Sequence, residues 1–294
     1  MCRGLVYNAN MLCVKKICLV RPVYKKYGRK EQQMITSMSN ARIKQLALWN
    51  QKAKERRKDG VFIAEGIKMF EEAPQGWIRE AYISESFYEK MPEKLAAKLD
   101  HCSYEVVSDA VFQKVSDTQT PQGILCVLKQ PKYEFTDLGV MRQTHPLVMV
   151  LEDIQDPGNL GTILRTGEGA GVTGVIMTKE TVDIFNPKTI RATMGSIYRV
   201  PFLYVDSIAE AIERLKRNSI SVFAAHLKGE RFYNELNFTR GTAFLIGNEG
   251  NGLKDETAAL ADVYLKIPME GRVESLNAGV AAAILMYEAH RQRG

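Results

Sequence analysis

Short apolar runs alternate with amphipathic stretches along the chain from about residue 40 onward. Runs rich in Val, Ile, Leu and Phe predict buried strands, whereas apolar positions three or four residues apart predict helices. We expect strands at residues 61–64, 78–83, 104–107, 123–128, 146–151, 172–178, 200–204, 220–225 and 242–246, and a further short strand ending at Pro268. Helices are expected to start after Ser39 and Asn40 and to lie near residues 66–72, 85–99, 108–115, 160–170, 187–194, 207–217 and 276–291. This alternation predicts an α/β fold, with a mostly parallel sheet covered by helices on both faces in the second half.

The length of the chain, 294 residues, predicts two domains, because single cores rarely grow much beyond about 250 to 300 residues. The segment 131–145 contains Pro131, Gly139 and mixed charge, which is typical of a linker. We therefore expect a first domain at residues 39–130 and a second at 146–294. Residues 1–38 show no clear period and are interpreted as a flexible or non-native extension.

Charge and cysteine content exclude several classes of protein. The net charge is +6, but the first 38 residues hold eight of the 40 Lys and Arg and one of the 34 Asp and Glu, so the rest is near neutral. Any RNA binding must therefore depend on local basic patches. The five cysteines form no C-x-x-C pair, which favours reduced thiols in a cytoplasmic protein and indicates no metal site. No apolar run of about 18 residues predicts a membrane span, and Lys15 and Lys16 interrupt the one candidate signal segment.

Three motifs follow strands and carry the candidate chemistry. The first is D-P-G-N-L-G-T-I-L-R-T at residues 156–166, which opens a helix. The second is L-I-G-N-E-G-N-G-L at 245–253, and the third is I-P-M-E-G-R-V-E-S-L-N-A-G-V at 267–280. A strand that ends in a glycine-rich loop lets a ligand touch the backbone, and the start of a helix offers free N–H groups. These loops therefore predict a pocket defined largely by backbone.

A fourth pattern, G-x-G-x-x-G at residues 169–174, matches the dinucleotide-binding fingerprint. That fingerprint must follow a strand and open a helix, whereas this copy closes a predicted helix and precedes a strand. We interpret it as a helix end and turn. The hypothesis of an NAD-dependent oxidoreductase therefore loses its main support.

Together the three motifs resemble those of the SpoU (TrmH-like) family of RNA 2′-O-ribose methyltransferases, members of the SPOUT class. The resemblance spans roughly residues 146–291, and residues 39–129 resemble the RNA-binding domain that often precedes this catalytic domain. It implies S-adenosyl-L-methionine as cofactor and structured RNA as substrate, with 23S rRNA as the leading candidate. It also implies a homodimer and a deep trefoil knot. Two alternatives stay open: a tRNA substrate, and a non-catalytic RNA-binding factor in ribosome assembly.

The resemblance also assigns candidate residues for the cofactor. The positions that match the family's cofactor contacts are Gly247, Ile267 and Leu276, with Asn248 and Met269 nearby. The side chains of Ile267 and Leu276 have an alternative role in the core, and backbone contact with a ligand is compatible with it.

Five residues are candidates for catalysis. Arg165 matches the family's catalytic arginine, and Asn159 lies in the loop expected to face the target ribose. Since a guanidinium resists deprotonation, holding phosphate and stabilising alkoxide charge is the physically easier role for Arg165. Glu249 is a candidate proton acceptor or orienting group, and its alternative role is to fix the glycine loop. Ser275 and Asn277 are expected to position ribose or backbone, or to serve only as helix caps.

A basic cluster and a polar loop in the first half are candidate RNA contacts. The cluster comprises Lys52, Lys54, Arg56, Arg57 and Lys58. A solvated helix end is the alternative, but the resemblance favours contact with phosphate. In the loop at residues 116–123, Gln122 is a candidate contact with RNA or with the second domain.

Overall fold

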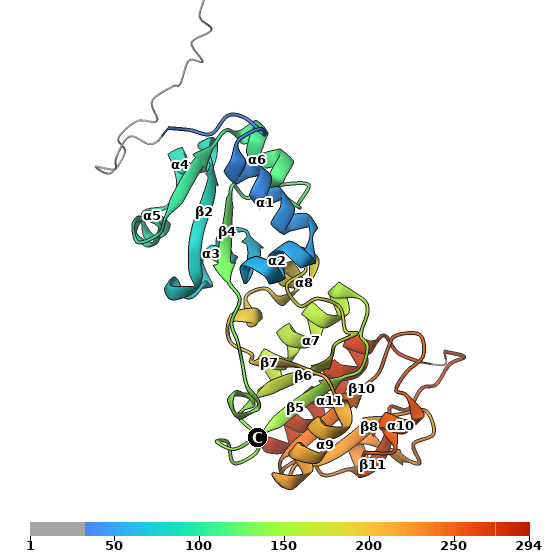
Figure 1. Cartoon of the computed structure of the whole chain (residues 1–294). Coiled ribbons are helices and arrows are strands. Elements are labelled where there is room, and N and C mark those ends of the chain that lie inside the picture. The colour runs from blue at the N-terminus through green and yellow to red at the C-terminus, as the bar shows by residue number, and fades with distance from the viewer. Residues whose placement is uncertain (1–32, 274) are drawn as a thin grey trace, which may run out of the picture.

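The first half of the chain folds around a four-stranded sheet (Figure 1). The computed structural model describes residues 33–273 and 275–294, so most of the predicted N-terminal extension lies outside the described residues. The strands are β1 (Val61–Glu65), β2 (Ile78–Ser84), β3 (Tyr104–Val107) and β4 (Ile124–Lys129), in the order β1-β4-β2-β3. Strand β4 is antiparallel to both of its neighbours, and β2 pairs parallel with β3.

Helices cover both faces of this sheet. Helices α1 (Ala41–Gln51) and α6 (Asp109–Val115) bury Ile43, Leu46 and Phe112 against one face. The opposite face is covered by α3 (Ile67–Glu72), α4 (Glu85–Lys90) and α5 (Glu93–Asp100), while α2 (Ala53–Asp59) follows α1. The side chain of Asn40 accepts a hydrogen bond from the Arg42 backbone N–H, so the predicted cap of the first helix is confirmed.

The second half contains a seven-stranded sheet in which every pairing is parallel. Its order is β7-β6-β5-β10-β8-β11-β9. The strands are β5 (Leu147–Leu151), β6 (Gly174–Thr178), β7 (Phe202–Val205), β8 (Ser221–Ala225), β9 (Arg231–Phe232), β10 (Thr242–Ile246) and β11 (Val263–Lys266). All residues of β5, β6 and β10 are buried, as expected for a parallel sheet covered on both faces. The predicted α/β class is confirmed.

Helices α7 (Pro157–Ala170) and α11 (Ala278–Arg293) pack together on one face, next to α8 (Pro187–Thr193). The other face carries α9 (Ile208–Arg217) and α10 (Asp255–Ala258). Short 3₁₀ turns lie at Gln75–Trp77, Phe135–Leu138, Ser196–Tyr198 and Tyr233–Glu235. Among the helices of the described ranges, none is long and apolar enough to cross a bilayer. The trefoil knot stays a prediction.

Both ends of α7 are set by capping residues. Helix α7 begins three residues earlier than expected, because Asp156 caps it and Pro157 suits the first helical position. It ends at Gly171, which adopts a left-handed conformation with φ 81°. The G-x-G-x-x-G segment is therefore a helix end and turn, as predicted.

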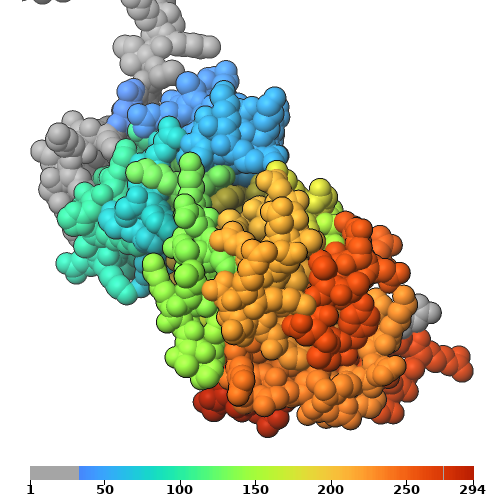
Figure 2. All heavy atoms as spheres, turned by 60° about the horizontal axis from the view of Figure 1, so that its bottom comes forward, coloured from blue at the N-terminus to red at the C-terminus, as the bar shows by residue number. Residues whose placement is uncertain are grey.

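The two halves share one continuous core. Phe62 of β1 packs against Phe185 with ring centroids 5.0 Å apart, and the Tyr198 hydroxyl donates to the Met69 carbonyl at 3.0 Å. Arg199 adds an ion pair with Glu72 across the junction at 2.8 Å. The space-filling view shows the halves in contact along this junction (Figure 2).

Candidate active site

The three sequence motifs meet at one edge of the parallel sheet. Leu151 at the end of β5 lies opposite Ile246 at the end of β10, so the chain leaves both strands at the same level. The third motif follows β11, which is separated from β10 by β8. Since parallel strands present their carboxyl ends at one edge, this edge is the expected place for a ligand site in such a sheet.

The glycine loop after β10 is held by its own hydrogen bonds. The backbone N–H groups and carbonyls of Asn248 and Gly252 pair with each other at 2.9 and 3.1 Å. The Asn248 side chain accepts from Gly250 N and Asn251 N and donates to the Asp153 carbonyl. A Cβ on Gly247 would lie 2.1 Å from backbone atoms of Gly252 and Leu253. The loop therefore needs a glycine at 247 for its own packing, a reason that the sequence alone did not show.

A cleft of about 640 Å³ opens beside this loop. It brings together the predicted cofactor residues from two motifs, and it also takes in Glu249 and Ser275. The predicted residues on its wall are Gly247, Asn248, Glu249, Ile267, Met269, Ser275 and Leu276. Its lining combines loop backbone with aliphatic side chains, and such clefts suit small organic ligands with a few fixed polar groups.

A polar chain next to the cleft links the three motifs. Asn159 Nδ2 donates to Glu249 Oε1 at 2.9 Å, and Asn159 Oδ1 accepts from Asn277 Nδ2 at 2.8 Å. Glu249 also accepts from the backbone N–H groups of Gln155 and Asp156, each at 3.0 Å. Both oxygens of the carboxylate are thus occupied, and the Asn159 amide is held in one orientation from both sides.

This arrangement keeps Glu249 ionised. Burial would raise the pKa of its carboxyl, but hydrogen bonds from Asn159, Gln155 and Asp156 outweigh that effect, and the net pKa is lowered. A carboxylate with a lowered pKa and three donors is a weak proton acceptor. Orienting Asn159 and the glycine loop is therefore the better role for Glu249.

Both halves of the chain match families of known proteins. Residues 146–287 match the SpoU rRNA Methylase family, and residues 40–126 match the MRM3-like substrate binding domain. The chain is 33% identical over 257 residues to the 23S rRNA (guanosine(2553)-2′-O)-methyltransferase RlmP of Bacillus subtilis. That alignment covers 87% of this chain and 98% of the relative. The chain belongs to the SpoU family.

Solved structures of SpoU proteins share the same architecture. An AdoMet-bound rRNA methyltransferase from Sinorhizobium meliloti has a TM-score of 0.77 at 31% identity, covering 88% of this chain and 97% of that one. The SpoU methyltransferase AviRb from Streptomyces viridochromogenes has a TM-score of 0.78 at 25% identity, covering 86% and 98%. Both likenesses extend over the two halves of the chain.

Arg165, the candidate catalytic arginine of this SpoU chain, stands apart from the cleft. It lies exposed on α7, and neither it nor Asn159 or Asn277 lines the cleft. Within the described part of the chain, its guanidinium makes no hydrogen bond or ion pair. All five of its donors are therefore available to a ligand.

The structure separates the predicted RNA contacts into two groups. Lys52, Lys54, Arg57 and Lys58 are exposed, and their side chains pair with no other described residue. Arg56 differs: it is 3% exposed and pairs with Asp183 at 2.6 Å. Its prediction as a phosphate contact is wrong for this conformation, because the guanidinium faces the second half of the chain. Gln122 is exposed, and its Oε1 accepts from Ile67 N at 2.8 Å.

Several residues of the site were missed. His226, Leu227 and Lys228 line the cleft directly after β8, and their position after a buried strand was the signal that could have found them. Glu152 follows β5 in the same way and is buried, accepting from Lys254 N and Thr257 Oγ1. It fixes the far end of the glycine loop. Among the described residues, no three His, Cys, Asp or Glu gather as metal ligands.

Proposed function

We propose that this protein methylates the 2′-hydroxyl of a ribose in structured RNA, with S-adenosyl-L-methionine as methyl donor and 23S rRNA as substrate. The observation that carries the proposal is the cleft between the second and third motifs, placed next to the Glu249, Asn159 and Asn277 chain. The Bacillus subtilis relative, named for 2′-O-methylation of 23S rRNA, supports the choice of substrate.

The residues of the cleft fit such a donor. Ile267, Met269 and Leu276 supply an aliphatic wall for the adenosine, and the loop from Gly247 supplies backbone groups. When bound, the donor supplies an electrophilic methyl group on a cationic sulfur. The ribose 2′-oxygen would take that methyl group while its proton passes to solvent, since neither Glu249 nor Arg165 is a ready base, and the sulfonium would leave as a neutral thioether. The AdoMet-bound relative from Sinorhizobium meliloti supports this assignment.

The polar residues take complementary roles in the proposal. Glu249 stays ionised and holds Asn159, which with Ser275 and Asn277 orients the ribose beside the cleft. Arg165 stays protonated, so it binds the phosphate next to the target ribose and stabilises negative charge on the 2′-oxygen. The exposed residues of the first half contact the RNA further away; they are Lys52, Lys54, Arg57, Lys58 and Gln122. Arg56 is left out as a phosphate contact, because its guanidinium pairs with Asp183.

We also propose that two copies assemble through α7 and α11. Val280 and Tyr287 are 48% and 50% exposed and lie seven residues apart, so they share one face of α11. Thr162 and Arg165 are exposed on α7, which packs against α11. A homodimer would cover this surface and place a second copy beside Arg165. The 23S rRNA substrate and the free thiols of Cys102 and Cys126 fit a cytoplasmic enzyme.

The test uses purified protein, methyl-labelled S-adenosyl-L-methionine and deproteinised total RNA from cells that lack the gene. We expect label in 23S rRNA and a single new 2′-O-methyl nucleotide when the product is mapped by nuclease resistance and mass spectrometry. Label in tRNA alone would contradict the assignment of 23S rRNA as substrate. Absence of label in any RNA, with tight RNA binding retained, would indicate a non-catalytic assembly factor.

A further inference from the structure

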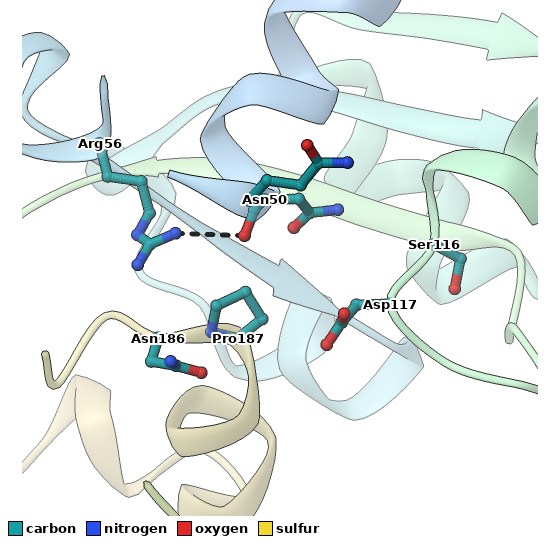
Figure 3. Close-up of a pocket in the computed structure, with 7 residues that line it drawn as sticks. Asn50, Arg56, Ser116, Asp117, Asn186 and Pro187 are labelled. Atoms are coloured by element: carbon teal, nitrogen blue, oxygen red, sulfur yellow. Dashed lines mark hydrogen bonds between the residues drawn. The ribbon is translucent and has the colours of Figure 1, made fainter. Parts of the chain in front are cut away.

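A second hollow lies where the two halves of the chain meet, and it shares no lining residue with the cleft. Its volume is about 360 Å³. The wall is formed by the end of α1, by α2, by the loop after α6 and by the start of α8 (Figure 3). The lining residues are Asn50, Gln51, Arg56, Ser116, Asp117, Asn186 and Pro187. We call this hollow the junction pocket.

Two buried atoms in the wall of the junction pocket have no hydrogen-bond partner in the described structure, Arg56 Nε and Asn50 Oδ1. Each of the other polar atoms in these two side chains makes at least one hydrogen bond. Arg56 donates to the carbonyls of Trp49 and Asn50 and to Asp183, and Asn50 Nδ2 donates to Val115 O. Arg56 Nε–H is thus a buried donor, and Asn50 Oδ1 a buried acceptor, that no described residue satisfies. Since a buried unpaired polar group is costly, a ligand that offers both an acceptor and a donor is favoured here after a small side-chain shift.

The charges around the junction pocket compensate each other. Arg56 pairs with Asp183, and Asp117 pairs with Arg191 of α8. A phosphate would gain little from the paired arginine, and it would meet the Asp117 carboxylate. These pairs favour a neutral ligand over an anion.

Two further amides extend the polar wall. Gln51 is exposed and its side chain makes no hydrogen bond with another described residue. Asn186 uses its Oδ1 to accept from Lys188 N at 2.9 Å, which leaves its amide nitrogen as a donor. Pro187 adds an apolar surface between these groups. A flat molecule with donors and acceptors on its edges meets this combination best.

We propose that the junction pocket binds an unstacked nucleobase of the RNA, next to the nucleotide that is methylated. The proposal rests on the proposed function, because it takes RNA as the substrate. Bases that are splayed out of a helix are recognised by hydrogen bonds to their edges, which the amides and the Arg56 Nε–H supply. The unpaired Lys52 follows Gln51 directly and is placed for an adjacent phosphate.

Two contacts connect the wall of the junction pocket to the candidate catalytic residues. Lys188, two residues after Asn186, pairs with Asp156 at 3.4 Å. Asp156 caps α7, and its side chain accepts from the backbone N–H of Asn159 at 2.9 Å. These contacts join the wall of the junction pocket to the Asn159 and Glu249 chain, and in the proposal one strand of RNA follows the same route.

The test uses full-length protein with labelled Asn and Gln side-chain amides, followed by NMR. The probes are the four ribonucleoside 5′-monophosphates, and ribose 5-phosphate is the base-free control. We expect saturable shifts at Asn50, Gln51 and Asn186 with at least one nucleotide and none with ribose 5-phosphate. Equal shifts with ribose 5-phosphate would show an anion site, and no shift with any nucleotide would show a pocket for water only. Either result overturns the proposal.

Matched variants connect the pocket to the reaction. Gln51→Trp places a large side chain at the pocket mouth, whereas Lys44→Trp places one on an exposed position of the same helix. Asn186→Ser keeps a capping oxygen for α8 and removes the amide donor. We expect Gln51→Trp and Asn186→Ser to lose the nucleotide shifts and to raise the KM for RNA about tenfold, the effect of losing roughly one hydrogen bond to the base. Lys44→Trp should change neither.

The two proposals fail differently. Nucleotide shifts at the junction pocket without methyl transfer to any RNA would contradict the methyltransferase function alone. Methyl transfer with an unchanged KM for RNA in Gln51→Trp and Asn186→Ser would contradict the junction pocket alone. Affinity for S-adenosyl-L-methionine should stay unchanged in all three variants.

Discussion

The Asn159 side chain donates to Glu249 at 2.9 Å and so joins the start of α7 to the glycine loop after β10. We predict that Glu249→Gln disrupts this link, because a glutamine must turn an NH₂ group toward at least one of three donors. The free energy of unfolding should fall by about 1 kcal/mol, the low end of the cost of an unpaired donor, because these donors are at most partly buried. Methyl transfer should fall more strongly than affinity for the methyl donor. Glu270→Gln, on an exposed neighbouring loop, is the control and should match the wild type in both measurements.

The stabilising effect of Glu249 should depend on pH. Hydrogen bonds keep the pKa of the folded carboxyl below the ordinary glutamate value of 4.5. The stabilisation is therefore fully present above that value and is lost as the pH falls through the folded pKa. Denaturant titrations at about pH 7 and about pH 3 should show the difference between wild type and Glu249→Gln shrinking at the lower pH. A difference that grows on acidification would contradict the ionised state of Glu249.

Gly247→Ala should damage the glycine loop itself. A Cβ at this position would lie 2.1 Å from backbone atoms, so the loop must move away from its place beside the cleft. We expect calorimetry to show loss of S-adenosyl-L-methionine binding together with a lower melting temperature. At Gly250 the nearest atom to a Cβ is 3.5 Å away, so Gly250→Ala should bind the donor normally. Equal binding by both variants would disprove this account of the loop.

Much of the architecture was predictable from the sequence. The uninterrupted apolar runs at 147–151 and 243–246 have no stable place except a buried strand, and both strands were predicted correctly. Three features of the fold were not anticipated: the split between α1 and α2 at Lys52, the short strand β9 and the four-residue helix α10. Their residues have no periodic pattern long enough to show them, and tertiary contacts fix their conformation.

Individual roles in the site were harder to predict than the fold. Gly247 was assigned to the cofactor on the basis of family resemblance, but its closest constraint is the backbone of Gly252 and Leu253. Arg56 and Arg57 carry the same charge and lie in the same helix. Only the ion pair of Arg56 with Asp183 in the folded chain gives them different roles. The distinction between the two arginines depends on a residue 127 positions away, and the one at Gly247 depends on how the loop folds back on itself; spacing along the chain encodes neither.

Arg56 and Arg57 form a natural pair for testing that distinction. Arg56→Ala removes one side of a buried ion pair and should lower the free energy of unfolding by about 3 kcal/mol, at the lower end of the range for such pairs because Asp183 is 24% exposed. Arg57→Ala should leave stability nearly unchanged and weaken RNA binding, with the slope of log affinity against log salt reduced by about 1. Denaturation and RNA binding at several salt concentrations measure both. A stability loss in Arg57→Ala, with stability unchanged in Arg56→Ala, would contradict the buried ion pair of Arg56.

Arg165→Ala should abolish methyl transfer and leave stability and donor affinity unchanged, since the side chain has no partner among the described residues and does not line the cleft. Arg165→Lys keeps the charge without the planar fork and should recover part of the activity. Single-turnover assays and calorimetry on the two variants test this. Donor affinity that falls in parallel with activity would mean that Arg165 belongs to the cofactor site.

A crystal structure with S-adenosyl-L-methionine bound tests the central claim most directly. We predict that the donor occupies the cleft beside the glycine loop, in contact with Gly247, Ile267 and Leu276, with its methyl group toward the Asn159 side chain. The claim is contradicted if the donor binds elsewhere, or if the cleft stays empty at saturating donor.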